Sequence, residues 1–362
     1  MKVLIISDYR DILNSVRPEG ELFIGLKKAG VDLTLMTFGD GEFLAEFKKA
    51  GIRVIDFHPE KKVSWSAIRF IRAELKRGKY DILHLFNSKA ISNGAFAAIG
   101  IPVKVLTYRG VIGITKWYNP NSYLKHLHPR IDGITAVSKA IQSYLQTQIF
   151  FNKNKVKHFY KGQNLDWYKN TKTADLKEFN LPKDAFIVTC VANYRRFKRI
   201  DYLINSTHFL AKNLPIYFLL IGRNMDATEN VKLLKKSPYQ NHFHLTGYRQ
   251  DAINLVKASD VYIQPSDHEG LGKGILEAMS LGIPPIVTNT GGPAEFVDNE
   301  QSGLIVEVKN ARAIAKAIER LYNDENLRKR LAVGAKATIE GRMNIRQSVV
   351  GLKRVYEAFL KA

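Results

Sequence analysis

Short apolar runs alternate with amphipathic helical patterns along this chain, and the alternation starts afresh near residue 180. The apolar runs predicted as buried strands in the first half are VLIIS (3–7), VDLTLMTF (31–38), DILHLF (81–86), VKVLTY (103–108) and GITAV (133–137). Those in the second half are FIVTCVAN, IYFLLIG, HFHLTG, VYIQPS and PPIVTN. Strands that alternate with helices form parallel sheets from βαβ units. Two such series predict an α/β protein with two Rossmann-like, doubly wound domains, whose ligand lies at the carboxyl ends of the strands in a cleft between them.

The length of 362 residues also suits two domains of about 150–180 residues each. The segment 163–182 is polar and lacks a strand core, so the hinge is expected there. No apolar run approaches the roughly 18–20 residues of a membrane-spanning helix. The start, MKVLIIS, is predicted to be a strand rather than a signal peptide, since no cleavage site of small residues follows. The single cysteine, Cys190, is expected to be a reduced core residue, which suits the cytoplasm.

The net charge of +21 implies an anionic partner: nucleic acid, a membrane surface or a phosphorylated ligand. Residues 101–165 hold ten Lys and Arg against one acid, whereas residues 251–300 hold two basic and eight acidic residues. Aromatic residues interleave with the basic ones in 113–130 and 148–162, a pattern that favours peripheral contact with an anionic membrane. A merely solvated basic face is the alternative. Nucleic acid is not expected, because no base-stacking or groove-reading motif accompanies the charge.

Two glutamates, Glu269 and Glu277, flank a glycine-rich turn in SDHEGLGKGILEAMSLGIPPIVTNTGGPAEF (266–296). A helix is expected to begin at 272–274, just after the strand VYIQPS, and to end at Gly282. Backbone N–H groups of the turn and the positive end of the helix form a natural anion site. An anion site flanked by two hydrogen-bond acceptors fits a phosphate joined to polyhydroxylated groups. The segment therefore predicts a nucleotide-sugar site.

The spacing E-G-x-G-x-x-x-x-E-A-M-x-x-G-x-P, followed by G-G-P-x-E, resembles the signature of glycosyltransferase family 4, whose members are retaining enzymes with the GT-B fold. The resemblance extends over nearly the whole chain, including VANYRRFKRIDYLI (191–204), LLIGRNMD and HFHLTGYRQD. It implies that Glu269 contacts the donor sugar, Glu277 the ribose hydroxyls and Lys198 the phosphates. It also implies domains at 1–165 (acceptor side) and 166–342 (donor side), with a final helix in 343–362 that packs back on the first.

The resemblance defines the candidate site. The catalytic residues are expected to be Glu269, Lys198, Arg195 and Arg196, and the donor-binding residues Glu277, Gly272, Lys273, Gly274, Gly222, Arg223, Gly247, Gly291, Gly292 and Arg17, with Arg109 on the acceptor side. No Asp-x-Asp motif is present, and neither a metal nor a cofactor is expected besides the nucleotide-sugar substrate. No general base is assigned.

Three positions depart from the family pattern. Asn193 stands where an arginine is usual, and Arg195 or Arg196 is expected to supply the missing guanidinium. Arg109 in TYRG stands where a histidine is common. The usual Gly-Gly loop is replaced by NSVRPEGEL (14–22), from which Arg17 is expected to meet the donor diphosphate.

The leading hypothesis is a retaining, metal-independent glycosyltransferase that transfers a sugar to a glycan or lipid-linked acceptor in bacterial lipopolysaccharide or surface-polysaccharide synthesis. A cytoplasmic location is expected, peripheral to the inner face of the membrane. The same fold acting on a soluble acceptor and a non-catalytic partner subunit are the alternatives. Simpler interpretations also stay open: an i,i+4 pair for Glu277 and Lys273, a solvated basic face for Lys198, and loop roles for His268 and Glu295.

Overall fold

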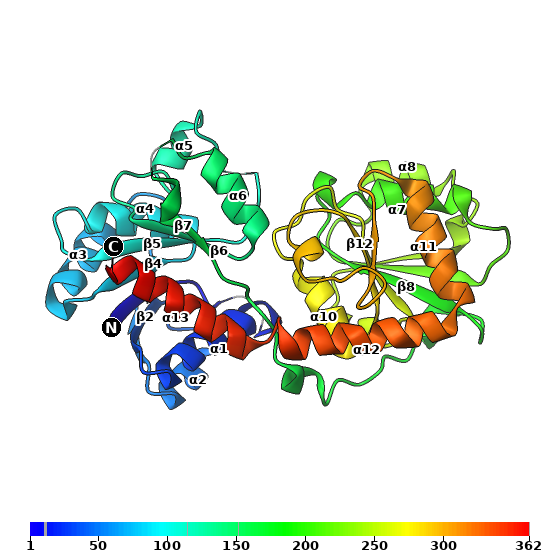
Figure 1. Ribbon diagram of the computed structural model, residues 1–362, viewed down its shortest axis with the longest axis horizontal. Coiled ribbons are helices and arrows are strands. Elements are labelled where there is room, and N and C mark those ends of the chain that lie inside the picture. Colours follow the sequence, from blue (N-terminus) through cyan, green and yellow to red (C-terminus); the bar gives the residue numbers. More distant parts are fainter. Residues whose placement is uncertain (11–12, 114, 151, 362) are drawn as a thin grey trace. The chain divides into compact units, whose positions relative to one another are not determined.

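The computed structural model of the protein describes residues 1–10, 13–113, 115–150 and 152–361. The chain divides into two compact units. Unit 1 comprises Met1–Gly162 together with Ile345–Ala362, and unit 2 comprises Gln163–Asn344. The chain therefore leaves unit 1 after residue 162 and returns to it at residue 345. The boundaries predicted from the sequence lie three residues later and two residues earlier, after residues 165 and 342. Each unit is a parallel sheet with helices packed on it (Figure 1).

The sheet of unit 1 has seven parallel strands in the order β3-β2-β1-β4-β5-β6-β7. Its strands are β1 (Lys2–Ile6), β2 (Asp32–Thr37), β3 (Arg53–Asp56), β4 (Ile82–Leu85), β5 (Lys104–Arg109), β6 (Gly133–Ala136) and β7 (Val156–His158). The five apolar runs predicted in this half are confirmed as strands. The two edge strands, β3 and β7, were not predicted, because both are short and only partly buried.

The helices of unit 1 are α1 (Leu13–Lys28), α2 (Leu44–Lys49), α3 (Trp65–Gly78), α4 (Ser88–Ala97), α5 (Pro120–Tyr123), α6 (Lys139–Thr147) and α13 (Ile345–Lys361). The interpretation of 14–22 as a loop is wrong, because this segment lies within α1 although the helix contains Pro18. Leu22, Phe23 and Leu26 follow one another at helical spacing and are buried in the core of unit 1. Burial of this apolar face outweighs the unfavourable helix propensity of proline and glycine.

The C-terminal helix α13 packs on unit 1. Leu352, Val355, Tyr356 and Phe359 all belong to the core that the sheet and α1 form. The Tyr356 hydroxyl lies 2.7 Å from Nδ1 of the buried His84 in β4. A helix from the end of the chain thus completes the core of the first unit.

The sheet of unit 2 has six parallel strands in the order β10-β9-β8-β11-β12-β13. They are β8 (Phe186–Val191), β9 (Ile216–Ile221), β10 (Phe243–Gly247), β11 (Val261–Gln264), β12 (Pro285–Thr288) and β13 (Leu304–Val306). The helices are α7 (Ile200–Ser206), α8 (Thr228–Leu234), α9 (Ala252–Lys257), α10 (Lys273–Leu281), α11 (Ala311–Asn323) and α12 (Glu325–Gly341). All five strands predicted in this half are confirmed, and only the three-residue edge strand β13 was not predicted.

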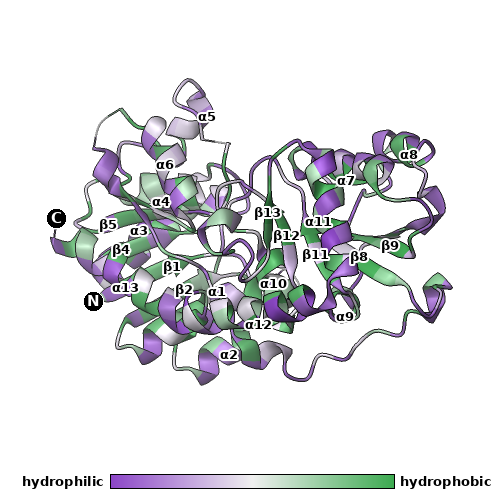
Figure 2. Ribbon diagram, turned by 45° about the vertical axis from the view of Figure 1, so that its right-hand side comes forward, coloured by the Kyte–Doolittle hydropathy of each residue, from purple (hydrophilic) through white to green (hydrophobic). Residues whose placement is uncertain are grey.

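Both faces of the second sheet contribute buried residues to apolar clusters, and Figure 2 draws its strands largely in green, the colour of hydrophobic residues. Val188 and Cys190 of β8 face one apolar cluster, while Ile187 faces the other. Burial on both faces explains why the strand sequences are continuously apolar instead of alternating. Cys190 is fully buried and unpaired, as expected for a core residue.

The strand orders define where a ligand is expected in each unit. The chain begins each sheet in the middle and proceeds first to one edge and then to the other, so the switch points lie between β1 and β4 and between β8 and β11. In doubly wound sheets, ligands bind beyond the carboxyl ends of the strands at such a point.

Candidate functional site

The residues predicted for the donor follow the carboxyl ends of β8 and β11, at the switch point of unit 2. The loop after β8 contains a 3-10 turn, Arg196–Lys198, and leads into α7. The loop after β11 carries Glu269 and leads into α10. The fold therefore brings Lys198 and Glu269 together although they are 71 residues apart in the chain.

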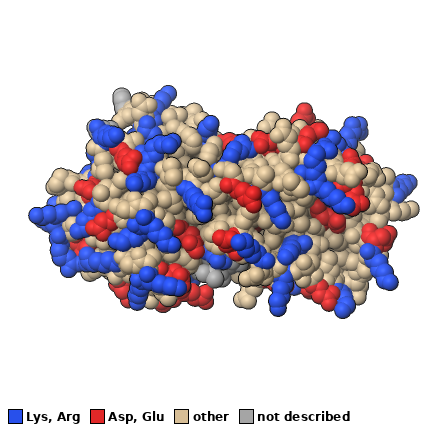
Figure 3. All heavy atoms as spheres, turned by 60° about the horizontal axis from the view of Figure 1, so that its bottom comes forward, with Lys and Arg blue, Asp and Glu red and all other residues tan. Residues whose placement is uncertain are grey.

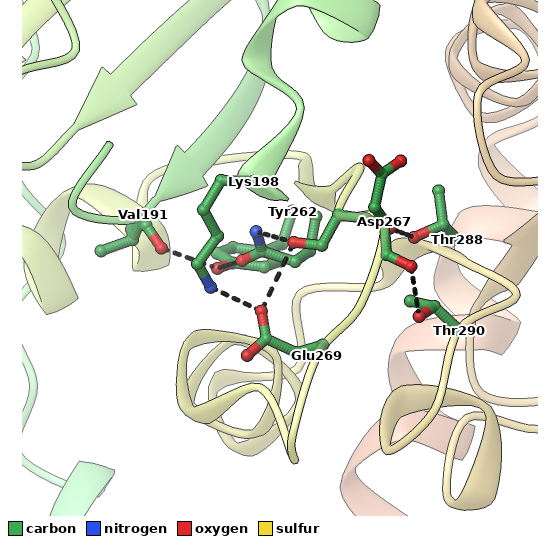
Figure 4. Close-up of polar contacts among 9 residues, drawn as sticks. Val191, Lys198, Tyr262, Asp267, Glu269, Thr288 and Thr290 are labelled. Carbon is green, nitrogen blue, oxygen red and sulfur yellow. Dashed lines mark hydrogen bonds and ion pairs between the residues drawn. The ribbon is translucent and has the colours of Figure 1, made fainter. Parts of the chain in front are cut away.

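Lys198 and Glu269 form an ion pair, with Nζ 2.5 Å from Oε2 (Figure 4). Their side chains are only 17% and 13% exposed. Such limited exposure reduces screening by water and salt, so the two charges interact more strongly than a surface pair. Lys198 is therefore not part of a solvated basic face.

A chain of buried polar groups reaches the Glu269 carboxylate (Figure 4). The Ser266 hydroxyl donates to Glu269 Oε2 at 3.4 Å, and Gln264 Nε2 donates to Ser266 Oγ at 3.0 Å. The Tyr262 hydroxyl lies 3.1 Å from Gln264 Oε1 and 3.2 Å from the carbonyl of Val191. Such a satisfied network orients a side chain before any ligand arrives. Sequence reasoning missed these residues, although Gln264 and Ser266 are polar residues in an otherwise apolar run.

The loop after β12 is bound to the loop that carries Glu269. Thr288 Oγ1 donates to the carbonyl of Ser266 at 2.5 Å, and the backbone N–H of Gly292 donates to the carbonyl of Glu269 at 3.1 Å. A Cβ on Gly292 would lie 2.0 Å from the carbonyl oxygen of Gly270. Glycine is required at Gly292 by this close approach and not by its backbone torsions, since its φ is −59°.

Arg199 fixes the loop after β8 to the same structure. Its guanidinium pairs with Asp267 at 3.3 Å and with Asp201 at 2.8 Å. The N–H of Asp267 donates to the carbonyl of Phe197 at 2.8 Å, and the Phe197 ring stacks on His268 with 4.5 Å between centroids. His268 thus has a packing role in the loop. Arg199 was not predicted, because four basic residues occur within 195–199 and the spacing does not distinguish them.

Helix α10 begins and ends as the sequence predicts, with Gly272 and Gly282 both in the left-handed conformation at its ends. A Cβ on Gly274 would lie 2.3 Å from the Tyr262 hydroxyl, so the first turn packs closely on β11. Glu277 is in the second turn, 13% exposed, and its Oε1 lies 3.1 Å from Lys273 Nζ. The i,i+4 pair that the sequence allowed is therefore formed, on the same helix that follows Glu269.

The turns after β8, β9 and β10 are joined at the positions of Asn193, Gly222 and Gly247. The N–H of Gly222 donates to the carbonyl of Gly247 at 2.8 Å, and the N–H of Arg223 donates to Asn193 Oδ1 at 3.1 Å. A Cβ on Gly222 would lie 1.9 Å from the carbonyl oxygen of Ala192. Asn193 therefore connects two turns at the position where the family usually has an arginine.

The structure does not add Arg195 or Arg196 to the Lys198–Glu269 pair. Both arginines are exposed, and among the described residues neither forms an ion pair. Arg196 lines a pocket between α7 and α8 that also contains Tyr194 and Glu229. Gly291 lies in the loop after β12, and Glu295 lies in the short 3-10 turn that follows it.

Arg17 and Arg109 belong to unit 1. Arg17 lies in α1, and Arg109 is the last residue of β5. Within the described ranges, no group of three or more His, Cys, Asp and Glu side chains is arranged as it would be around a metal ion. A search of the same ranges finds no helix that is long and apolar enough to cross a membrane.

Two family descriptions match consecutive parts of the chain. "Glycosyltransferase Family 4" matches residues 20–167, and "Glycosyl transferases group 1" matches residues 171–338. Together they extend over both units.

Two curated relatives are each 29% identical to this chain over the aligned residues. The lipopolysaccharide core biosynthesis glycosyltransferase LpsE of Rhizobium meliloti (strain 1021) is 29% identical over 170 residues, which are 47% of this chain and 49% of that protein. The UDP-Gal:alpha-D-GlcNAc-diphosphoundecaprenol alpha-1,3-galactosyltransferase of Escherichia coli is 29% identical over 274 residues, 70% of this chain and 69% of that protein.

Solved structures share the fold over the full length. Anabaena HepE in complex with UDP and glucose has a TM-score of 0.78 with 18% identity, and the match includes 100% of both chains. With both units matched in order, the chain belongs to glycosyltransferase family 4 and has its GT-B fold of two Rossmann-like domains.

Proposed function

We propose that this glycosyltransferase moves a sugar, with retention of its anomeric configuration, from a nucleotide-diphosphate sugar to a glycan or lipid-linked acceptor in lipopolysaccharide or surface-polysaccharide synthesis. The observation that carries the proposal is the Lys198–Glu269 pair at the β8/β11 switch point, with Glu277 on the helix that follows. The names of LpsE and of the diphosphoundecaprenol galactosyltransferase support the pathway and the acceptor class. The complex of HepE with UDP and glucose supports the donor class.

Each charged group has a part in this proposal. Glu277 accepts hydrogen bonds from the ribose hydroxyls, and Glu269 accepts them from the sugar. Lys198 and the N–H groups at the start of α10 meet the charge that grows on the departing diphosphate. Removal of one preorganised donor of this kind costs about 10²–10³ in kcat in other enzymes. Lys198→Met is therefore expected to reduce turnover by about that factor.

The proposal includes activity without an added metal ion and retention without a separate general base. Lys198 and the helix end supply positive charge at the diphosphate, and the departing phosphate assists attack on the same face of the sugar. Transfer that persists in EDTA would support the first part. The coupling constant of the product's anomeric proton in NMR reports the second, and an inverted product would overturn it.

Thermal-shift measurements with UDP, GDP, ADP and CMP test the donor site. Glu277→Ala is expected to lose most of the stabilisation that one nucleoside diphosphate gives the wild type, because the ribose loses its acceptor. Glu325→Ala is the matched control, since Glu325 also forms an i,i+4 pair with a lysine, on an exposed face of α12 in the same unit. Its nucleotide response should equal that of the wild type.

The outcomes separate the enzyme from a non-catalytic partner subunit. Stabilisation by a nucleoside diphosphate, followed by slow hydrolysis of the matching nucleotide sugar, supports transfer chemistry. The absence of a shift with every nucleotide would overturn the proposal and favour the partner subunit.

A peripheral position on the cytoplasmic face of the membrane is also part of the proposal. Three exposed aromatic residues of unit 1 form a cluster around Trp117, whose ring contacts Tyr118 at 5.6 Å and Phe150 at 5.4 Å between centroids. Lys116 Nζ lies 5.3 Å from the Tyr118 ring. Aromatic rings beside basic residues suit the headgroup level of an anionic bilayer. Lys and Arg also cover more of the face drawn in Figure 3 than Asp and Glu do.

Flotation with vesicles tests this position and distinguishes a lipid-linked from a soluble acceptor. The wild type should float with phosphatidylglycerol vesicles and much less with phosphatidylcholine vesicles. Trp117→Ser with Phe150→Ser should abolish flotation, whereas Trp65→Ser should not, although Trp65 is the most exposed tryptophan at 75%. If the double variant floated as well as Trp65→Ser, the proposal that Trp117 and Phe150 contact the membrane would be contradicted.

A further inference from the structure

Two nitrogens of the Arg109 guanidinium are buried without an acceptor. Among the described residues, neither Nε nor Nη2 has a hydrogen-bond partner. These two nitrogens form the edge that binds a carboxylate or phosphate in a bidentate manner. Burial also lowers the pKa of Arg109, as expected for a charge removed from water without compensation. A buried charged donor without an acceptor is unfavourable, so the ligand-free protein is incomplete at this point.

Lys125 is a described cation that interacts with Arg109, and only the Tyr144 hydroxyl acts against the lowering of the Arg109 pKa by burial. Burial lowers the pKa of the half-buried Lys125, and the charges of Lys62 and Arg109 lower it further. His126 is buried and neutral, with its pKa lowered to about 3 by burial and by the charges of Arg109 and Lys125. Its Nδ1 lies 2.9 Å from Thr107 Oγ1, so it is already hydrogen-bonded. No described carboxylate contributes to the electrostatics of Arg109 or Lys125.

A second arginine in the same unit shows what a structural role looks like. The Arg130 guanidinium donates to the carbonyls of Ala98 and Ile101 at 3.0 Å and pairs with Asp132 at 2.6 Å. Each of its three guanidinium nitrogens thus donates to an acceptor within the protein. The fold thus supplies acceptors for Arg130 but none for Nε and Nη2 of Arg109 among the described residues.

The position of Arg109 is also that of a binding residue. It ends β5, and the carboxyl ends of parallel strands lie at the edge of the sheet where ligands bind. The neighbouring strand β6 leads into α6, which Ser138 caps, and the N–H of Val137 donates to the Arg109 carbonyl at 3.3 Å. The amino-terminal end of α6 adds further positive potential near Arg109.

We propose that the acceptor carries an anionic group, a phosphate or a carboxylate, which Arg109 binds with its Nε–Nη2 edge and Lys125 binds as a second cation. The inference rests on the proposed function, because it assigns the chemistry of the acceptor in that reaction. Both nitrogens are covered in the free protein, so binding is accompanied by movement of the atoms that cover them. The anion can be the phosphate of a polyprenyl carrier or an acidic group of the glycan.

The test is calorimetric titration of the full-length protein, with the donor site filled by the nucleoside diphosphate that stabilises it. The probes are farnesyl monophosphate for the lipid phosphate, glucose 6-phosphate and glucuronic acid for an acidic glycan, and glucose as the uncharged reference. At least one anionic probe should bind tenfold more tightly than glucose. Arg109→Gln should remove at least tenfold of that affinity, and Arg109→Lys should restore only part of it.

Two controls keep the result interpretable. Lys104→Gln removes a positive charge from the other end of the same strand and should leave the affinity unchanged. Lys125→Gln should weaken binding even if the Arg109 variants do not fold. Equal binding of charged and uncharged probes, or equal binding by wild type and both Gln variants, would overturn the proposal.

The two proposals fail in different ways. If the nucleotide binds and no anion does, the anionic acceptor is wrong while the donor assignment stands. If no nucleotide binds, the proposed function fails, and titration of the nucleotide-free protein still shows whether Arg109 holds an anion. A preference for farnesyl monophosphate identifies the lipid carrier, and a preference for the acidic sugars identifies the glycan.

Discussion

Replacement of Gly292 by alanine should destabilise unit 2, although alanine fits the backbone torsions there. Gly292 has φ −59° and ψ −46°, and a glycine-to-alanine change at compatible torsions usually stabilises a protein by about 0.4–1 kcal/mol. The new Cβ, however, would lie 2.0 Å from the carbonyl oxygen of Gly270 and 2.8 Å from Cα of Leu271. Because both are backbone atoms, the loop that carries Glu269 must move. Overpacking of this kind costs about 1–3 kcal/mol, so the net change should be a loss.

Thermal unfolding followed by circular dichroism measures the effect, with the nucleotide-sensitive transition marking unit 2. A unit of this size loses about 2–4 °C in Tm for each kcal/mol. Gly341→Ala is the matched control, because no heavy atom lies within 4 Å of its Cβ at the end of α12. This control should raise the Tm. If Gly292→Ala also raised it, the close approach of the two loops would be refuted. Nucleotide binding should weaken in Gly292→Ala as well, since the Gly292 N–H holds the Glu269 carbonyl.

Three further outcomes concern titratable groups. Burial raises the pKa of Cys190 to about 12, so a thiol reagent at pH 8 should label the protein only after unfolding, and fast labelling of the folded protein would contradict this. Burial lowers the pKa of His84 and His126 to about 3, so each stabilises the fold fully above pH 6.5 and less as the pH falls. For each histidine, the free energy of unfolding should fall by about 2 kcal/mol between pH 6.5 and pH 5. An unchanged Tm over that range would be inconsistent with neutral buried rings. Glu269→Gln removes the partner of Lys198, so calorimetry should find tighter binding of the nucleoside diphosphate and weaker binding of its sugar conjugate; equal losses for both would refute this division of roles.

The central strands of both sheets could be predicted because burial on two faces leaves a continuous apolar run. The edge strands β3, β7 and β13 could not, since an edge strand is partly exposed and its three or four residues carry little pattern. The error at α1 has another cause. Pro18 and Gly20 suggest a loop locally, and only the sheet on which Leu22 and Leu26 pack decides for a helix.

At the candidate site too, contacts between distant segments could not be predicted from the sequence. Glu269, Glu277 and Lys198 could be named as candidates from the sequence, because a motif of fixed spacing distinguishes them from other charged residues, and their roles stay predictions. The role of Asn193 could not be predicted, since its partner is a backbone N–H 30 residues away. Arg199 could not be separated from its basic neighbours, because only the loop after β11 brings it to Asp267. Contacts between loops that follow different strands depend on the register of the sheet, which one sequence does not reveal.

The two segments of opposite net charge also differ in how their charged side chains are paired. The segment 251–300 is acidic, yet three of its carboxylates at the candidate site are paired with cations: Glu269 with Lys198, Asp267 with Arg199, and Glu277 with Lys273. Under the proposed function, a diphosphate would therefore not meet a field of free negative charge there, and it would take Lys198 from Glu269 as Glu269 gains the sugar hydroxyls. The segment 101–165 is the opposite case, since no described carboxylate contributes to the pKa shifts of Arg109 and Lys125. In the two proposals, unit 2 exchanges internal ion pairs for those of its ligand, whereas unit 1 holds cations whose partner is the anionic group of the acceptor.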